Sequence, residues 1–367
     1  MTVALFHLSH AAKPNSTSAT VKDRRYKWLH RFALFTAFAT LILIWSGGNV
    51  TSKGAGLAVP DWPNTFGYNM FLFPVSKWVG GIFSEHVHRL VASTIGFLII
   101  ILVVWLWRVE HRRWLRKLGY AALFTVILQG VLGGLRVTML KDEIGIFHAC
   151  LAQAFFGMLI VIGLATSRMW QRISVSDFSG HDAARKLAPA AIITTGLIFA
   201  QLALGATMRH QHRDLAILDF PSAYGQLLPD VTPAKIAEIN AWRNASALSE
   251  VTPAQIWLQM AHRFLAVLIT AGVIVSLLRA RAADLLTTPL TRFGEAWFLL
   301  LVGQITLGAW VIWSNKAADI ATAHVAVGAA MLAIGISISA ICLRLLQREQ
   351  RTVLPERLPV AENVHAL

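Results

Sequence analysis

The residues best suited to chemistry lie in the stretch Glu85–Arg89, which reads Glu-His-Val-His-Arg. This stretch stands at the start of a long apolar run that continues beyond Trp107. Ionisable side chains at the mouth of a membrane helix are costly unless they bind a ligand or take part in a reaction. Imidazoles can ligate a metal and a carboxylate can accept a proton. The stretch therefore indicates a cofactor site with an acid–base group beside it.

The same layout recurs in the stretch Gln259–Arg263, which also opens an apolar run. His-Arg occupies the same places in both copies, but the first copy has Glu85 where the second has Gln259. A residue three positions before a His lies on nearly the same face of a helix. Because only the carboxylate can take up a proton, we expect the chemistry in the first copy. The alternative is that Glu85 only forms an i,i+4 salt bridge with Arg89.

Two further histidines, His148 and His324, extend this internal repeat. His88 and His148 are 60 residues apart, and His262 and His324 are 62 residues apart. Corresponding points of the two halves are therefore separated by 174 and 176 residues. Each His lies near the start of an apolar run of the same direction. We therefore expect all four at one depth, near the outer face of a membrane.

A small residue follows each of these histidines four positions later, on the same helical face one turn along. Such a residue leaves room for a flat macrocycle beside a ligating imidazole, and pairs of His on facing helices hold haem in helical proteins. Zinc or copper would need ligands that converge on one point, whereas two separate pairs suit two axial ligand sets. The alternative for a single His is a packed or interfacial polar residue. The small residues are Ala92, Ala152, Ala266 and Gly328.

Arg89 and Arg263 each follow one of the candidate ligands. A guanidinium binds carboxylates bidentately, so both side chains are candidates to bind haem propionates near the outer surface. The alternative is an interfacial Arg that extends its charge into water.

Membrane helices must position these residues, because the chain of 367 residues is 56% hydrophobic and only 14% charged. Eight apolar runs are long enough to span a bilayer. The expected fold is an all-α integral membrane protein whose eight transmembrane helices form two pseudo-symmetric four-helix bundles. The predicted spans are 30–50, 86–107, 118–138, 146–168, 188–208, 257–280, 293–313 and 321–345.

The repeat also predicts how the chain is divided. Residues 22–170 form the N-terminal bundle and residues 188–346 the C-terminal bundle, joined by a cytoplasmic linker over 171–187. A disordered cytoplasmic tail is expected over 1–21 and a second cytoplasmic tail over 347–367.

The net charge of +14 reflects topology rather than a nucleic-acid partner. With eight spans, the tails and the segments after spans two, four and six share one side, and they carry 22 of the 33 Lys and Arg with 9 acids. The other side carries 11 basic and 10 acidic residues. This is the positive-inside distribution, which places both termini in the cytoplasm. No basic face with base-stacking aromatics is evident, so we expect no nucleic-acid binding.

Two long segments, 49–84 and 209–256, are predicted on the outer side. The first is rich in aromatic residues, which favour either an interfacial belt or a lid over a flat apolar ligand. The second contains the sequence Val-Thr-Pro-Ala twice, at Val231 and at Val251. Thr can cap a helix and Pro can take its first position, so a surface helix and span six should begin there.

Taken together, several short motifs resemble the haem A synthase family in their order and spacing, over nearly all eight spans. These motifs are Gly47-Gly48 with Thr51–Gly56, Pro60–Pro63, Glu85–Arg89, His148, Met260–Arg263 and His324. Some members of that family have a cysteine pair in each outer segment. Here both outer segments lack Cys, and Cys150 and Cys342 fall inside spans, where they resemble small core residues rather than a disulfide.

The resemblance implies an oxidoreductase of haem biosynthesis that converts a methyl group of haem O to the formyl group of haem A, for cytochrome c oxidase assembly. It implies that Glu85, His88 and His148 belong to the substrate-haem site in the N-terminal half. It also implies that His262 and His324 ligate the iron of a bound haem b in the C-terminal half.

The resemblance further implies haem O as substrate, membrane lipid around the chain, a haem O synthase that supplies the substrate, and an electron-transfer partner. A homo-oligomer is left open. The expected location is the cell inner membrane, in preference to the mitochondrial inner membrane. The alternative function is a di-haem b electron carrier of the quinone-linked cytochrome b type, and a haem transporter or chaperone is a weaker reading. A carrier would more usefully place its haems at two membrane depths, whereas the four histidines share one.

The charge distribution makes a topology prediction. Reporter fusions at residue 240 and at the C-terminus should report opposite sides of the membrane, because an odd number of predicted spans separates them. Reporters on the same side would contradict the eight-span arrangement.

Overall fold

The computed structural model describes residues 16–175, 181–210, 215–282 and 289–353. Within these residues the regular elements are helices, and β-structure is limited to two isolated bridges. The longer helices are α1 (Ser16–Ser52), α2 (Gly80–Val109), α3 (Arg113–Met139), α4 (Asp142–Ala165), α6 (His181–His210), α8 (Pro253–Ala282), α9 (Pro289–Trp313) and α10 (Ala318–Val353). The shorter ones are α5 (Arg168–Val175), α7 (Pro233–Ala245) and the 3-10 turns η1 (Met70–Leu72) and η2 (Val75–Lys77).

The eight predicted spans are confirmed in the described part of the chain. Each of the eight long helices contains a stretch that is long and apolar enough to cross a bilayer. The helices extend beyond the predicted spans, because their ends include polar residues such as Arg25 and Gln347 that apolar patterning does not count. α1 begins at Ser16, inside the tail predicted over 1–21, and the rest of that tail lies outside the described residues.

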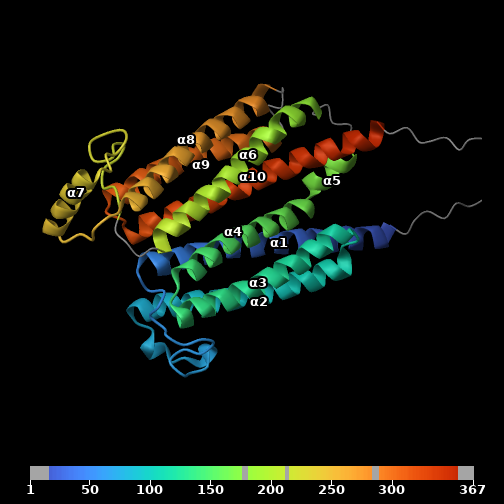
Figure 1. Cartoon of the computed structure of the whole chain (residues 1–367). Coiled ribbons are helices and arrows are strands. Elements are labelled where there is room, and N and C mark those ends of the chain that lie inside the picture. Colours follow the sequence, from blue (N-terminus) through green and yellow to red (C-terminus); the bar gives the residue numbers. More distant parts are fainter. Residues whose placement is uncertain (1–15, 176–180, 211–214, 283–288, 354–367) are drawn as a thin grey trace, which may run out of the picture.

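The long helices form two groups of four, α1–α4 and α6 with α8–α10 (Figure 1). In the first group, α1 and α3 each contact α2 and α4; in the second, α6 and α9 each contact α8 and α10. Contacts of α1 with α10, and of α4 with α6 and α10, join the groups. The order of helices around both groups is therefore the same, and the two-fold relation between them stays a prediction.

Apolar side chains occur on all sides of these helices, as expected for segments surrounded partly by protein and partly by lipid. One buried cluster runs through both groups and includes Leu29, Ile99, Leu159, Trp297 and Ile341. Large apolar residues also face outward, for example on α2 and α3. This outer surface suits a bilayer, because water would penalise so much exposed apolar area.

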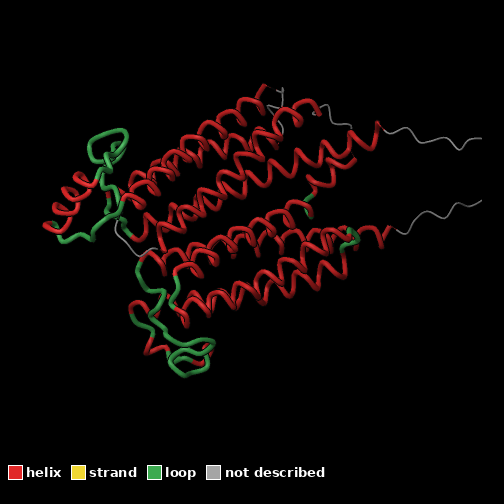
Figure 2. Tube along the Cα trace, in the orientation of Figure 1, coloured by secondary structure: helices red, strands yellow, loops and turns green. Residues whose placement is uncertain are grey.

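The described ends of α1 and α10 lie at one end of the molecule, and the long loops lie at the other (Figure 2). The loop at the second group contains α7, which begins at Pro233, and α8 begins at Pro253. Both Val-Thr-Pro-Ala helix starts are therefore confirmed. Thr232 occupies the N-cap position of α7, but its side chain makes no capping hydrogen bond.

Candidate functional site

The four candidate ligands lie on α2, α4, α8 and α10, within about the first three turns of each helix. These ends adjoin the long loops (Figure 1). His88 and His148 lie close enough for their charges to interact, and the rings of His262 and His324 have centroids 6.5 Å apart. The structure therefore brings the four histidines together as two pairs, one in each group of helices.

Each imidazole packs against a glycine of the neighbouring helix. A Cβ atom at Gly47 on α1 would lie 3.0 Å from Cε1 of His88. A Cβ atom at Gly133 on α3 would lie 3.5 Å from Cε1 of His148. In the second group, the corresponding distances are 3.5 Å from Gly205 to His262 and 3.1 Å from Gly308 to His324. The missing side chains thus make room for the rings. This contact comes from the adjacent helix, whereas the predicted role of the small residue four positions after each His stays a prediction.

Three of these glycines follow a glutamine by four residues, so that both lie on one helical face. Gln129 Nε2 donates to the backbone oxygen of His148, and Gln201 Nε2 donates to that of His262, each at 3.0 Å. Gln304 Nε2 lies 3.5 Å from Nε2 of His324.

The helix that supports His88 has Leu43 at the corresponding position, four residues before Gly47. The Gln-x-x-x-Gly pattern is visible in the sequence, and its recurrence is the signal that could have identified these supporting residues.

The ring nitrogens of the four histidines have no other hydrogen-bond partner in the described part of the chain, and all four Nδ1 atoms are buried. A buried polar atom without a partner costs about 1–3 kcal/mol, and water is scarce inside a membrane. The rings therefore fit a role as ligands of a bound group.

The second pair also has the spacing of axial ligands. A metal–imidazole nitrogen bond is about 2.0–2.1 Å long, so imidazoles on opposite sides of one metal have centroids roughly 6–6.5 Å apart. The observed 6.5 Å between His262 and His324 meets this condition. No cluster of three or more His, Cys, Asp or Glu able to hold a metal occurs among the described residues.

Glu85 and Gln259 occupy equivalent places, and each holds one of the two long loops against its helix. These loops are called the outer loops below, after the side on which the sequence predicts them. Oε2 of Glu85 accepts a 2.9 Å hydrogen bond from the amide of Val59. The amide group of Gln259 accepts from the Ile217 amide at 2.9 Å and donates to the Ile217 oxygen at 3.0 Å. Both side chains are buried. The predicted equivalence of the two positions thus extends to their loop contacts.

The salt bridge between Glu85 and Arg89, the alternative left open above, is present. Arg89 Nη2 lies 2.6 Å from Glu85 Oε1, and little of either side chain is exposed. The Arg89 guanidinium also donates to the backbone oxygens of Val59, Asp61 and Asn64. These bonds hold the first outer loop over the N-terminal end of α2.

Arg263 makes equivalent bonds in the second half, to the backbone oxygens of Asp219, Pro221 and Ser222. Arg89 thus makes three hydrogen bonds to loop carbonyls and one to Glu85. Arg263 makes three hydrogen bonds, all to loop carbonyls. The propionate contacts expected for both residues stay predictions.

Each outer loop contains the same aspartate-centred turn. Asp61 accepts hydrogen bonds from the amides of Phe66 and Gly67, and Asp219 accepts from those of Tyr224 and Gly225. Burial raises the pKa of Asp61, but the hydrogen bonds from Gly67 and Phe66 outweigh burial and hold the pKa below its usual value. The carboxylate is therefore ionised, and it fixes the turn that supplies carbonyls to the arginine.

Aromatic residues of the first loop cover the outer end of the first group. Trp62 packs so closely on Gly134 that a Cβ there would lie 2.3 Å from the indole ring. His86, unassigned in the sequence, is fully buried between Phe73 and Trp78, with ring centroids 5.1 and 4.8 Å away. Trp62 thus reaches the glycine next to the one that supports His148, but Trp62 and Phe71 are also exposed, so a lid and an interfacial belt both stay open as predictions.

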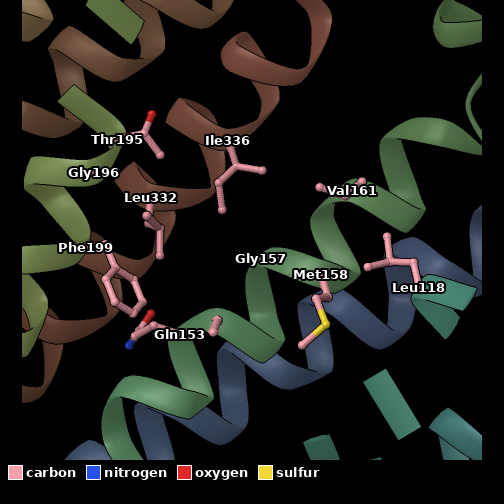
Figure 3. A pocket seen from close by; sticks show the side chains of 11 residues that line it. Leu118, Gln153, Gly157, Met158, Val161, Thr195, Gly196, Phe199, Leu332 and Ile336 are labelled. Carbon is pink, nitrogen blue, oxygen red and sulfur yellow. The ribbon is translucent and has the colours of Figure 1, made fainter. Parts of the chain in front are cut away.

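A separate cavity of about 490 Å³ lies between the groups (Figure 3). Figure 3 shows α4 facing α6 and α10 across it, with Gln153, Gly157, Phe199, Leu332 and Ile336 among its walls. The walls are mostly apolar and include none of the four histidines. The cavity is therefore distinct from both His pairs.

The glycine contacts predict different outcomes for two matched substitutions. Gly308→Ala should lower the amount of haem b retained by the purified protein, because the new methyl group would lie 3.1 Å from His324 and displace its ring. Gly205→Ala should retain the normal amount of haem b, because its new methyl group would lie 3.5 Å from Cε1 of His262, which is an ordinary van der Waals distance. Both changes raise helix propensity by about 1 kcal/mol, so general stability effects are matched. Equal haem content in the two variants would contradict the role of the glycine.

The comparisons with known proteins agree with this geometry. Residues 68–336 match the model of a family described as cytochrome oxidase assembly protein. A haem A synthase of Shouchella clausii is 25% identical over 80% of this chain and 89% of its own length. Those of Alkalihalophilus pseudofirmus and Shewanella oneidensis are each 26% identical, over 82% and 83% of this chain and 92% of their own lengths.

The resemblance to haem A synthase drawn from the sequence motifs is confirmed by these relatives. The match to the family model covers both His pairs, the three supporting glutamines and three of the four supporting glycines, and Gly47 lies before it. The chain therefore belongs to the cytochrome oxidase assembly protein family.

Proposed function

We propose that this protein is a haem A synthase, which oxidises a methyl group of haem O to the formyl group of haem A. The observation that carries the proposal is the two pairs of imidazoles whose ring nitrogens are otherwise almost without partners. Their number and arrangement suit two haems. The relatives named haem A synthase, which align with most of the chain, support the same function.

The second half is proposed to hold a permanent haem b between His262 and His324. The 6.5 Å separation of the rings supports this assignment. Gln259 has no charge and cannot exchange a proton, so the residue next to this pair is unsuited to acid–base work.

The first half is proposed to bind haem O between His88 and His148, with Glu85 as the acid–base group. Iron, when bound, supplies the redox chemistry of the site. Oxidation of a methyl group removes hydrogen from carbon, and a carboxylate can accept a proton or stabilise developing positive charge. Glu85 lies one turn outward of His88 and is fixed by Val59 and Arg89, so its position is defined before substrate binds.

The surroundings follow from this function. A haem O synthase must supply the substrate, and an electron-transfer partner must exchange electrons with the protein. The bacterial relatives and the charge distribution support a multi-pass protein of the bacterial cell membrane with cytoplasmic termini. The competing di-haem carrier would hold both haems permanently and leave both unchanged.

Pigment extraction tests the proposal. The purified protein should yield haem b together with haem O or haem A. His262→Ala and His324→Ala should each deplete haem b, because one axial ligand is lost, and should leave haem O or haem A in the first half. Measurement is by chromatography of the extracted haems, normalised to protein. Haem b alone in the unaltered protein would favour the carrier, and full haem b in both variants would contradict the ligand assignment.

Glu85→Gln tests the acid–base role. The structure indicates that glutamine is tolerated, because Gln259 makes the equivalent loop contact in the second half. Haem binding should survive, since His88 and His148 remain. Haem A formation should fall roughly a hundredfold or more, as expected for loss of a general base.

Glu143→Gln is the matched control, because it removes an exposed carboxylate from the same outer rim. It should leave both haem content and haem A formation unchanged. Normal haem A per protein in Glu85→Gln would remove Glu85 from the mechanism and leave it with the loop contact alone.

A further inference from the structure

Arg136 lies in the last turn of α3 and is half-buried beside the first His pair. Its guanidinium occupies a narrow slot between the first outer loop and α4. A Cβ atom at Gly56 in the loop would lie 2.9 Å from both Nη1 and Nη2. A Cβ atom at Gly145 on α4 would lie 3.2 Å from Nε of Arg136 and 2.6 Å from Nδ1 of His210 on α6. Gly56 therefore leaves space that the guanidinium fills, and Gly145 leaves space for the His210 ring and for Nε of Arg136.

Backbone conformation does not account for either glycine. Neither Gly56 nor Gly145 has the positive φ that favours glycine over other residues. Gly145 lies in the first turns of α4, where glycine costs helix stability by up to about 1 kcal/mol relative to alanine. The absence of a side chain at Gly56 is thus explained by room for Arg136 on α3, and that at Gly145 by room for both His210 and Arg136.

The Arg136 guanidinium makes no hydrogen bond or ion pair within the described residues, and its nitrogens keep some access to solvent. Glu85 and Asp142 lie within electrostatic reach, but the nearer partner of Glu85 is Arg89. By contrast, the guanidinium groups of Arg89 and Arg209 donate to backbone oxygens. A partly buried cation without a bonded anion is costly, so the slot calls for an anionic ligand.

Arg136 lies near the first His pair. The charge of Arg136 acts on both His88 and His148. Arg136 also follows Gly133, the glycine that supports His148, by three residues and so lies near it on one helical face. The second half has Val311 at the corresponding place after Gly308, so a cation at this position is specific to the first half. Arg209, whose charge acts on His324, lies on α6 instead and donates to Gly48 and Ser52.

We propose that Arg136 binds a propionate carboxylate of the substrate haem in the first half. The inference rests on the proposed function, because it takes the ligand of the first His pair to be a haem. A guanidinium grips a carboxylate through two parallel hydrogen bonds, which fixes orientation as well as adding affinity. A macrocycle bound in this way has its propionate edge fixed beside Arg136. The orientation of that edge determines which methyl group can reach Glu85.

The first test is pigment extraction from purified full-length variants. Arg136→Gln should lower haem O plus haem A, measured per haem b, by about tenfold, the size expected for a lost charge-assisted pair. Arg136→Lys should retain an intermediate amount, because it keeps the charge but loses the two-bond geometry. Lys141→Gln removes an exposed positive charge from the same rim and should change nothing.

Gly56→Val provides an independent variant with the charge intact. Its side chain would enter the slot and displace the guanidinium, so haem O plus haem A should fall as in Arg136→Gln while haem b stays constant. An unchanged ratio in Arg136→Gln would overturn the proposal. Equal loss of haem b and of first-half haem would also overturn it, since Arg136 would then serve the fold.

A second test uses haem O and its dimethyl ester as probes for binding to the unaltered protein and to Arg136→Gln. The unaltered protein should prefer the free acid by about tenfold, and the variant should not discriminate. No preference in the unaltered protein would overturn the role of Arg136. An unaltered protein that carries haem b alone would instead contradict the proposed function, while the comparison of acid with ester would still decide the role of Arg136.

Discussion

The cost of an imidazole nitrogen without a partner inside a membrane is the constraint on which this structure depends. Four rings lie at the outer ends of membrane helices, and their nitrogens have almost no protein partners. Such groups persist only where a ligand satisfies them and where the surrounding chain holds them in place. The glycines make room for the rings. Two glutamines bind the backbone of a ligand histidine, and the third lies beside a histidine ring. The loops held by Arg89 and Arg263 cover the outer end.

The two halves use one scaffold and differ in charge. Glu85 and Arg136 stand in the first half where neutral Gln259 and Val311 stand in the second. The loop contacts of Glu85 and Gln259 are nearly the same, so the scaffold does not require the carboxylate. A carboxylate that the loop contact does not require supports the proposal that the first half carries the reaction.

The spans and the starts of α7 and α8 could be predicted because local signals define them: apolar runs of bilayer length and a Thr-Pro pair before each start. The contacts of Arg89 could not, since its carbonyl acceptors at Val59 and Asn64 are 30 and 25 residues away and depend on how the loop folds back. The same holds for Arg136, which meets Gly56 only after three helices have assembled. Patterns along one helix were readable, whereas contacts between a helix and a distant loop required the structure.

The leucine that stands before Gly47 has a kinetic consequence. Gln129, Gln201 and Gln304 contact His148, His262 and His324 in that order. His88 has Leu43 at the corresponding position, which cannot form such a hydrogen bond. How long a bound group stays is governed chiefly by its rate of departure, and that rate rises as attachments are removed. A cofactor that stays for the life of the protein needs two secured ligands, whereas a substrate must leave after every turnover. With one ligand less constrained, the first half would suit the exchange, and the second half the retention, that the proposed function requires.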